Sequence, residues 1–352
     1  MNKTILSMVF FILILYSCKP DTKKNNTIKN TNQVIKTNNN AVNNSDKIDN
    51  VRFLVVLQDK NKILLTDNNL KSIKNYESDE FINAGMWSSK TKKAVFLSTK
   101  SDIRTISLID LKTDNCLKIR GKWLSKPSIS SSGKYASFVR IKNNEFGLNI
   151  INLEENTVKT VFKYKVQDII PLKVIQKCVP VFSNNNRLIA FPVYQNENYH
   201  LYIYNIETAE YKKLTYGKND NYYANFSPDS RRIIYISKRE NTQIFTMRIN
   251  GKSRKRLTFS GANKSSPGYS PDGKKIAYIS QYKKTCRIYV MNSKGDYKRV
   301  IRKSYNLITY CKFLNNNVLL YKTTSGIYKI NINTREDNNV LRKSFSFIAP
   351  SQ

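Results

Sequence analysis

Two segments of twelve residues in the chain have nearly the same sequence. This recurrence restricts the possible folds more than any other feature of the sequence. FSPDSRRIIYIS spans Phe226 to Ser237, and YSPDGKKIAYIS spans Tyr269 to Ser280, 43 residues later. Looser copies begin at Trp87, Ile129, Phe182 and Phe313. A unit that recurs at an interval of this length is typical of solenoids and propellers.

The spacing of the copies is close to constant. The motif serine, or the residue aligned with it, recurs at intervals of 42, 53, 44, 43 and 44 residues, at Ser88, Ser130, Ser183, Ser227, Ser270 and Leu314. The one longer interval contains residues 163–177, which we interpret as an inserted loop or edge segment.

Each unit contains the material for about four short strands. After the motif come an apolar run, a polar turn, an alternating segment such as HLYIYNI or QIFTMRI, and a short segment such as KKLT or KRLT. Alternation of apolar and polar residues is typical of half-buried strands. The 22 Tyr and 16 Phe residues of the chain also favour strands. Four strands in a unit of this length predict one blade of a β-propeller.

The two best copies resemble the PD40 repeats of TolB-type β-propellers, which also occur in the propeller domains of prolyl oligopeptidase and dipeptidyl peptidase relatives. With the looser copies, the resemblance covers about residues 80–342. It implies an all-β fold, a β-propeller of four-stranded blades. Because propellers have many functions, the resemblance is more specific for the fold than for the function.

The two ends of the repeat region predict how the ring closes. Residues 51–77 have the pattern of the last three strands of a unit, and Lys343–Pro350 has the pattern of one remaining strand. Pairing between them would remove exposed sheet edges. We therefore favour seven blades, with the ring closed by the C-terminal strand. Six blades, common among TolB-type proteins, is the alternative if the N-terminal segment forms a separate cap.

The N-terminus has the composition of an export signal. Lys3 precedes an apolar run from Ile5 to Leu15 that is too short for a typical membrane span. The sequence LYSC at Leu15–Cys18 resembles a bacterial lipobox. The resemblance implies cleavage after Ser17 and lipid attached to Cys18. An ordinary signal peptide, in which Cys18 has no such role, is the alternative.

These features divide the chain into three parts. Residues 1–17 are predicted to be a lipoprotein signal peptide. Residues 18–50 are predicted to be the lipidated Cys18 and a disordered tether, because this segment is rich in Asn and Lys and has no aromatic residue. Residues 51–350 are predicted to form the TolB-like β-propeller.

The repeated motif has the residues of a turn. One copy has Ser227, Pro228 and Asp229, and the other has Ser270, Pro271, Asp272 and Gly273. Proline sets φ for the turn, Asp accepts hydrogen bonds from nearby backbone N–H groups, and Gly accepts positive φ. The looser copies have Lys90, Ser132 and Asn185 where the motif has Asp, so a ring of carboxylates is absent. We predict a structural turn rather than a cation site.

The residue types of common catalytic and metal sites are scarce. His200 is the single histidine, and it lies in an alternating segment. The sequence SSSGK at residues 130–134 lacks the full phosphate-binding pattern, and no Gly-x-Ser-x-Gly motif is present. Cys116, Cys178, Cys286 and Cys311 have no metal-like spacing and are predicted either to pair in disulfides or to stay buried thiols. We predict no catalytic residue, no metal, no cofactor and no enzymatic activity.

The net charge of +35 is compatible with an anionic partner or membrane surface, or with a bias in the composition of the genome. The densest basic cluster contains Lys252, Arg254, Lys255 and Arg256. It is a candidate contact for an anionic partner. The alternative is that these residues form a solvated turn without a partner. Nucleic acid is not expected as a partner behind an export signal.

The expected function is that of a non-enzymatic lipoprotein that binds other proteins of the cell envelope. The resemblance to TolB implies a role in envelope integrity with a peptidoglycan-associated lipoprotein. The outer-membrane protein assembly machinery is a second partner class. TolB proteins are soluble in the periplasm and have an N-terminal α/β domain, whereas here an anchor and a tether precede the propeller. The expected location is the periplasmic face of the outer membrane, and the cell surface is its alternative. The alternative functions are an adhesin for anionic host polymers and a propeller that binds a small ligand or sugar.

Overall fold

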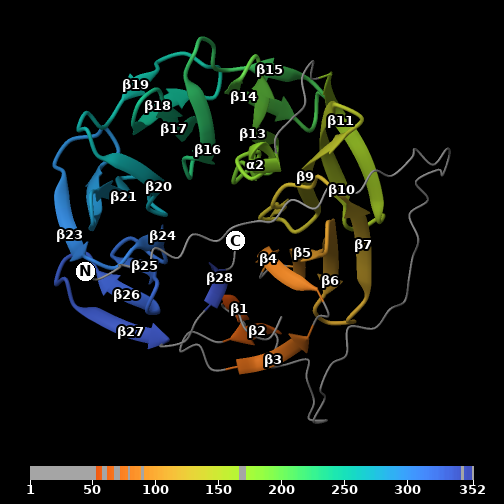
Figure 1. The fold of residues 1–352 in the computed structure, drawn as a ribbon, viewed down its shortest axis with the longest axis horizontal. Coiled ribbons are helices and arrows are strands. Elements are labelled where there is room, and N and C mark those ends of the chain that lie inside the picture. Colours follow the sequence, from red (N-terminus) through yellow and green to blue (C-terminus); the bar gives the residue numbers. More distant parts are fainter. Residues whose placement is uncertain are drawn as a thin grey trace, which may run out of the picture.

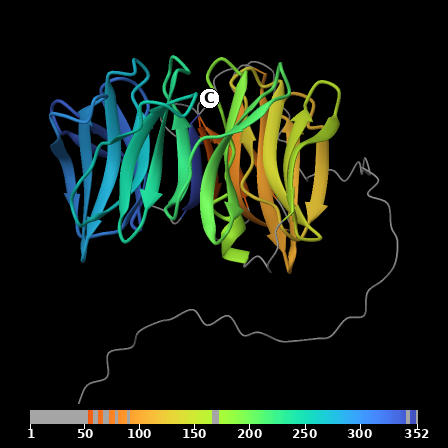
Figure 2. The ribbon, with the colours of Figure 1, turned by 90° about the horizontal axis from the view of Figure 1, so that it is seen from above.

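The strands of this protein form a ring of sheets. The computed structural model describes residues 53–57, 62–66, 72–77, 80–88, 91–165, 172–341 and 345–350. The predicted signal peptide, Cys18 and the predicted tether lie outside these residues. Strands in the described part pair into seven four-stranded antiparallel sheets around a central axis (Figure 1). Seen edge-on, the ring is a flat disc whose strands run across its thickness (Figure 2).

Six of the sheets are each built from four consecutive strands. They contain β4 (Phe81–Ser88), β5 (Lys93–Lys100), β6 (Ile103–Asp110) and β7 (Cys116–Gly121); β8 (Ser128–Ile129), β9 (Tyr135–Lys142), β10 (Glu145–Asn152) and β11 (Thr157–Lys165); β12 (Val181–Phe182), β13 (Leu188–Gln195), β14 (Asn198–Asn205) and β15 (Tyr211–Lys213); β16 (Asp220–Phe226), β17 (Arg232–Lys238), β18 (Thr242–Arg248) and β19 (Lys255–Arg256); β20 (Asn263–Tyr269), β21 (Lys275–Tyr282), β22 (Thr285–Asn292) and β23 (Arg299–Ser304); and β24 (Ile308–Phe313), β25 (Val318–Thr323), β26 (Ile327–Asn331) and β27 (Asp337–Leu341).

The remaining sheet joins strands from distant parts of the chain. It has the order β28-β1-β2-β3, with β28 (Phe345–Pro350), β1 (Phe53–Leu57), β2 (Lys62–Thr66) and β3 (Ser72–Glu77). Residues of β1 and β28 pair antiparallel, from Phe53 opposite Pro350 to Leu57 opposite Phe345. The prediction of an all-β propeller with four-stranded blades is confirmed. The total number of blades, for which seven was favoured, stays a prediction.

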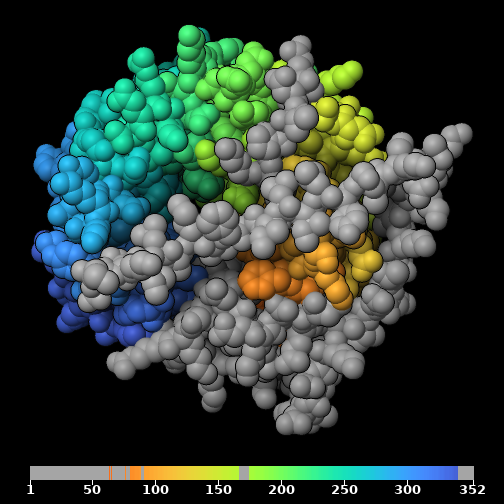
Figure 3. Space-filling view, viewed as in Figure 1, coloured from red at the N-terminus to blue at the C-terminus, as the bar shows by residue number. Residues whose placement is uncertain are grey.

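Each blade of consecutive strands is oriented with its first strand toward the axis and its fourth strand at the rim, as β16 and β19 show in Figure 1. The second strand is buried on both faces because a neighbouring blade packs on each side. In β17, all five residues from Ile233 to Ser237 are buried. This explains why the motif is followed by a continuous apolar run rather than by an alternating one. In the space-filling view, side chains of the neighbouring blades coloured from green to blue pack against one another (Figure 3).

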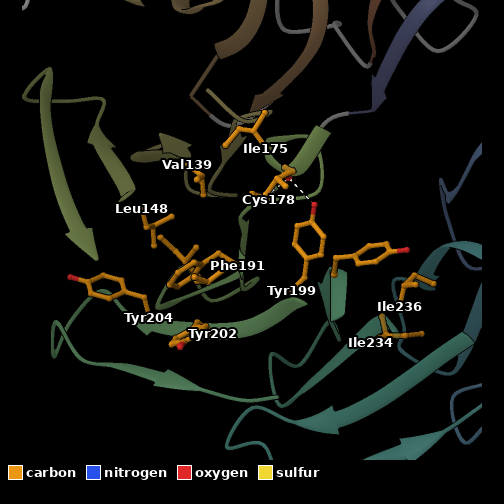
Figure 4. Close-up of a cluster of buried hydrophobic side chains, with 14 of the residues drawn as sticks. Val139, Leu148, Ile175, Cys178, Phe191, Tyr199, Tyr202, Tyr204, Ile234 and Ile236 are labelled. Carbon is orange, nitrogen blue, oxygen red and sulfur yellow. Dashed lines mark hydrogen bonds between the residues drawn. The ribbon is translucent and has the colours of Figure 1, made fainter. Parts of the chain in front are cut away.

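The long interval in the repeat is not simply an inserted loop. Residues 163–165 complete β11, and Leu172–Ile175 form the short helix α2. Ile175 and Cys178 are fully buried and lie beside Tyr199 (Figure 4). The Tyr199 hydroxyl donates to the Val174 carbonyl at 3.3 Å. The segment therefore contributes to the core between blades.

Aromatic rings join two neighbouring blades in this core. Phe162 belongs to the rim strand β11, and its ring centroid lies 5.2 Å from that of Phe191 and 5.3 Å from that of Tyr202 in the next blade. A third ring, Tyr211 in β15, lies 4.9 Å from Phe162 at 87°. Edge-to-face contacts of this kind add to the free energy gained from burial.

The four cysteines of the ring are free thiols rather than disulfides. Cys178, Cys286 and Cys311 are buried, and burial raises the pKa of the Cys311 thiol to about 12. A thiol with a raised pKa is protonated at neutral pH and is a poor nucleophile.

Among the described residues, no helix has the length and the apolar composition of a membrane span.

Candidate functional site

The second motif copy forms a hydrogen-bonded turn between β20 and β21. The Ser270 hydroxyl donates to Asp272 Oδ1 at 2.5 Å and accepts a bond from the Lys275 N–H at 2.9 Å. Asp272 also accepts a bond from the Lys274 N–H at 3.1 Å, and Gly273 has a φ of 70°. Hydrogen bonds from Ser270 and the backbone lower the pKa of the Asp272 carboxyl.

The first copy forms the same turn between β16 and β17. The Ser227 hydroxyl donates to Asp229 Oδ1 at 2.6 Å, which lowers the pKa of Asp229. In this turn Ser230 takes the positive φ, at 58°. The looser copies keep the contact with other acceptors: Ser183 Oγ lies 2.6 Å from Asn185 Oδ1. A carboxylate is therefore not required for the turn geometry, and a ligand role for Asp229 and Asp272 has no support from these contacts.

Hydrogen bonds also link these turns from one blade to the next. Ser131 Oγ donates to Asn186 Oδ1 at 2.9 Å, and the Asn185 N–H donates to Ser230 Oγ at 3.3 Å. Further round, the Asp272 N–H donates to Asn316 Oδ1 at 3.0 Å. The motif turns thus form a chain of contacts on one face of the ring. Sequence alone did not show these links, because each one joins residues more than 40 positions apart.

Replacing Asp272 with Ala is expected to lower the free energy of unfolding by about 1 kcal/mol at neutral pH, because the Ser270 hydroxyl and the Lys274 N–H lose their shared acceptor. The pKa of this carboxyl is lowered in the folded state. Its stabilising effect is therefore present at neutral pH and lost as the pH falls through the lowered pKa. Denaturant unfolding at neutral and acidic pH measures both effects.

The matched control for this prediction is Asp102→Ala, since Asp102 is an exposed turn residue outside the motif. Its substitution should change the unfolding free energy by less than about 0.5 kcal/mol. Equal losses in the two variants, or a loss in Asp272→Ala that does not shrink in acid, would contradict the assigned role of the carboxylate.

A cavity of about 490 Å³ lies between the two full motif turns. Both signs of charge line it, including Asp229, Asp272, Arg232 and Lys255. Among the residues that the structure describes, no three His, Cys, Asp or Glu side chains gather to hold a metal ion. The cavity has the size and polarity for a small polar ligand.

The structure spreads the predicted basic cluster over two surfaces. Lys252, Arg254, Lys255 and Arg256 are all exposed. The Arg254 guanidinium lies 5.0 Å from the ring centroid of Phe245, whereas Lys255 Nζ donates to the Lys294 carbonyl at 2.8 Å in the next blade. Side chains alternate along a strand, so Lys255 points away from Arg256 in β19. The four residues therefore do not form a single contact patch.

His200 is placed in β14, where its side chain is only 4% exposed. Burial, with a smaller effect from Lys213, lowers the pKa of this imidazole. Its Nδ1 has no hydrogen-bond partner within the described parts of the chain. A neutral buried imidazole is suited to a structural role.

The opposite face of the ring carries exposed aromatic side chains. β16 runs from the loop after β15 to the motif turn, so loops that link blades and motif turns lie at opposite ends of the inner strands. Tyr216, Phe259 and Tyr305 lie in three such loops, and each is more than half exposed. Tyr282, also more than half exposed, lies at the end of β21 on the same face.

Each of these rings has a cation close to it. The distance from the charged group to the ring centroid is 5.3 Å for Lys213 and Tyr216, 5.0 Å for Arg256 and Phe259, 5.6 Å for Lys283 and Tyr282, and 5.3 Å for Lys303 and Tyr305. We call these four pairs the aromatic face. Exposed rings and Arg side chains are enriched where proteins bind other proteins.

The sequence contained one signal for this face that our reading missed. Tyr216 and Phe259 each follow a buried Leu and a Thr, at the same position in two consecutive repeats. An aromatic residue repeated directly after the last buried position of a blade indicates an exposed ring in the connecting loop. The sequence-based prediction placed the partner contact at the basic cluster of Lys252–Arg256 instead.

Comparisons with known proteins agree on the fold. The family model of the TolB beta propeller domain, PD40, matches residues 162–351. Searching curated protein sequences finds no match. TolB from Acinetobacter baumannii is 18% identical with a TM-score of 0.53, and the match covers 74% of this chain and 67% of that one.

Two of the similar structures are enzymes. An oligogalacturonate lyase from Vibrio parahaemolyticus is 13% identical with a TM-score of 0.58, over 83% of this chain and 85% of the lyase. A prolyl endopeptidase is 12% identical with a TM-score of 0.62, over 84% of this chain and 51% of the peptidase. The prediction that the chain is not an enzyme, made from its residue types and motifs, is wrong, because proteins with this fold catalyse reactions. Identities this low show the fold alone.

Proposed function

Because the chain belongs to the family of TolB β-propeller domains, we propose that its ring binds another protein of the bacterial cell envelope. The observation that supports this best is the aromatic face, where four exposed rings each lie within 5.6 Å of a cationic group. Large rings supply contact area at a small cost in conformational entropy, and cations select a partner with negative charge.

The chemistry of the face favours an acidic partner surface. The three blade-linking loops that carry Tyr216, Phe259 and Tyr305 have a single carboxylate at their borders, Asp220. Acidic residues on the opposite face, such as Glu154 and Glu207, are exposed and pair with Lys134 and Arg187. The three loops, with their rings and neighbouring cations, are therefore suited to an acidic segment.

The candidates for this partner are a peptidoglycan-associated lipoprotein or a component of the outer-membrane protein assembly machinery. The corresponding roles are envelope integrity and a scaffold for assembly. We propose residues 1–17 as a signal peptide, Cys18 as the lipid attachment site, and residues 51–350 as the propeller. A flexible segment of residues 18–50 would hold the ring about 30 Å from the lipid, at the periplasmic face of the outer membrane.

Crosslinking in intact cells, followed by purification of a tagged chain, tests this function. We expect envelope proteins to crosslink to the native chain and the yield of the same proteins to fall at least tenfold for the triple variant Tyr216→Ala, Phe259→Ala, Tyr305→Ala. Tyr297→Ala is the matched control, because Tyr297 is 86% exposed and is not one of the four rings of the aromatic face. A triple variant with the yield of the control would exclude the aromatic face.

A second candidate function is supported by the cavity between the motif turns, whose polar lining fits a small ligand or sugar. A ligand there should raise the melting temperature of the native chain and not that of Arg232→Ala. The adhesin alternative needs a ring outside the cell, so protection of the protein from protease added to intact cells would exclude it.

A further inference from the structure

A buried lysine lies directly beside the aromatic face. Lys264, the second residue of β20, is only 4% exposed. Its Nζ donates to Ser260 Oγ and to the Ala262 carbonyl, both at 2.7 Å. An ammonium group has three N–H donors, and a buried one is normally paired with a carboxylate. In the described part of the chain, no ion pair joins Lys264 to an acidic residue.

Two further cations converge on the same place. The Arg256 guanidinium lies 5.0 Å and Lys298 Nζ lies 5.7 Å from the ring centroid of Phe259. Arg256 Nε donates to the Thr258 carbonyl at 2.6 Å, which fixes the guanidinium near this loop. Phe259 is thus the one ring of the aromatic face that lies close to two cations.

The three cations come from two blades and act on one another. Arg256 belongs to β19, whereas Lys264 and Lys298 belong to the following blade. Burial first, and then the charges of Arg256 and Lys298, lower the pKa of Lys264 to about 8. The seam between these blades therefore concentrates positive charge.

We propose that this seam is a binding site for an oxyanion, a carboxylate or phosphate group, held by Lys264, Arg256 and Lys298. Ammonium and guanidinium groups form short charge-assisted hydrogen bonds with such oxygens. An anion between them replaces mutual repulsion with attraction, and the low dielectric next to a buried amine strengthens the gain. Phe259 stays exposed beside the anion and contacts the apolar part of whatever molecule carries it.

The oxyanion has two sources that the experiment must separate. It is either an Asp or Glu side chain of the protein partner, in which case this inference rests on the proposed function, or a free phosphate. The first source predicts that an oligoglutamate peptide binds more tightly than inorganic phosphate, because neighbouring carboxylates reach the other cations of the aromatic face.

The test follows the titration of Lys264 by NMR in the full chain with isotope-labelled lysine. We expect inorganic phosphate, compared with chloride at equal ionic strength, to raise the pKa of Lys264 by about one unit, since a bound anion stabilises the charged amine. The oligoglutamate peptide should give the same change at a tenfold lower concentration if the source is a protein partner. If the peptide and inorganic phosphate raise the pKa of Lys264 at equal concentrations, the site is assigned to a free anion. This result supports the site without the partner.

Variants of the two exposed cations keep the test independent of the stability of the core. Arg256→Gln and Lys298→Gln should each weaken phosphate binding about tenfold. Lys112→Gln, which removes an exposed lysine in the turn between β6 and β7 of another blade, should leave it unchanged. A pKa of Lys264 that is the same in phosphate and chloride, or phosphate binding that all three variants weaken equally, would overturn the proposal. The phosphate arm needs no partner, so its failure is distinct from a failure of crosslinking.

Discussion

Ending the chain after Leu341, which removes β28, is expected to lower the free energy of unfolding by several kcal/mol and to cause aggregation. In the intact chain, five residue pairs join β28 to β1. Without them, the sheet of β1, β2 and β3 has three strands, and β1 has a free edge. Each lost hydrogen bond contributes about 1 kcal/mol, and a free edge pairs readily with other chains.

Denaturant unfolding and size-exclusion chromatography measure these two effects. A chain that ends after Pro350 keeps every residue of β28 and is the control, which should match the native chain in both measurements. A truncated chain with an unchanged unfolding midpoint would show that the ring does not depend on this strand. The same result would favour six blades with a separate N-terminal segment.

Phe162→Ala is expected to cost about 3–5 kcal/mol in the free energy of unfolding. Phe162 is 4% exposed, and its ring contacts rings of β13, β14 and β15 in the neighbouring blade. Truncation leaves a cavity between two blades. The loss of each ring contact lowers the free energy of unfolding further. The measurement is denaturant unfolding, with the slope checked for two-state behaviour.

Two further variants make this result interpretable. Phe162→Leu keeps most of the volume and should cost about 1.5 kcal/mol or less. Tyr297→Ala removes a ring that is 86% exposed and should change stability by less than about 0.5 kcal/mol. A loss in Phe162→Ala no larger than that in Tyr297→Ala would mean that the two blades are not joined through this ring.

The features that sequence predicted well are those decided within one repeat. Ser270, Asp272 and Gly273 lie within four positions and specify their turn without help from the rest of the chain. The apolar run after the turn and the alternating strand beyond it are equally local, so the four-stranded blade could be predicted. Residues 163–177 were harder, because the burial of Ile175 and Cys178 depends on a neighbouring blade.

The candidate site depended on tertiary contacts and was therefore mostly missed. Lys264 and Lys298 are 34 positions apart, and nothing in either neighbourhood shows that both charges meet near Phe259. The cluster from Lys252 to Arg256 looked like one patch because its members are adjacent in sequence, although strand alternation separates Lys255 from Arg256. The prediction of no enzymatic activity failed for another reason: it argued from the scarcity of common catalytic residue types, whereas enzymes share this fold.

The sheet shared by the two ends of the chain also sets an order of events during biosynthesis. β1 is made early, yet its partner β28 follows about 290 residues later. At roughly 5–20 residues per second, β1 waits on the order of 15–60 s before that partner exists. Every other described blade can pair its strands as soon as they emerge, since its four strands are consecutive. Chaperone demand should therefore concentrate on the N-terminal strands and end when β28 is released.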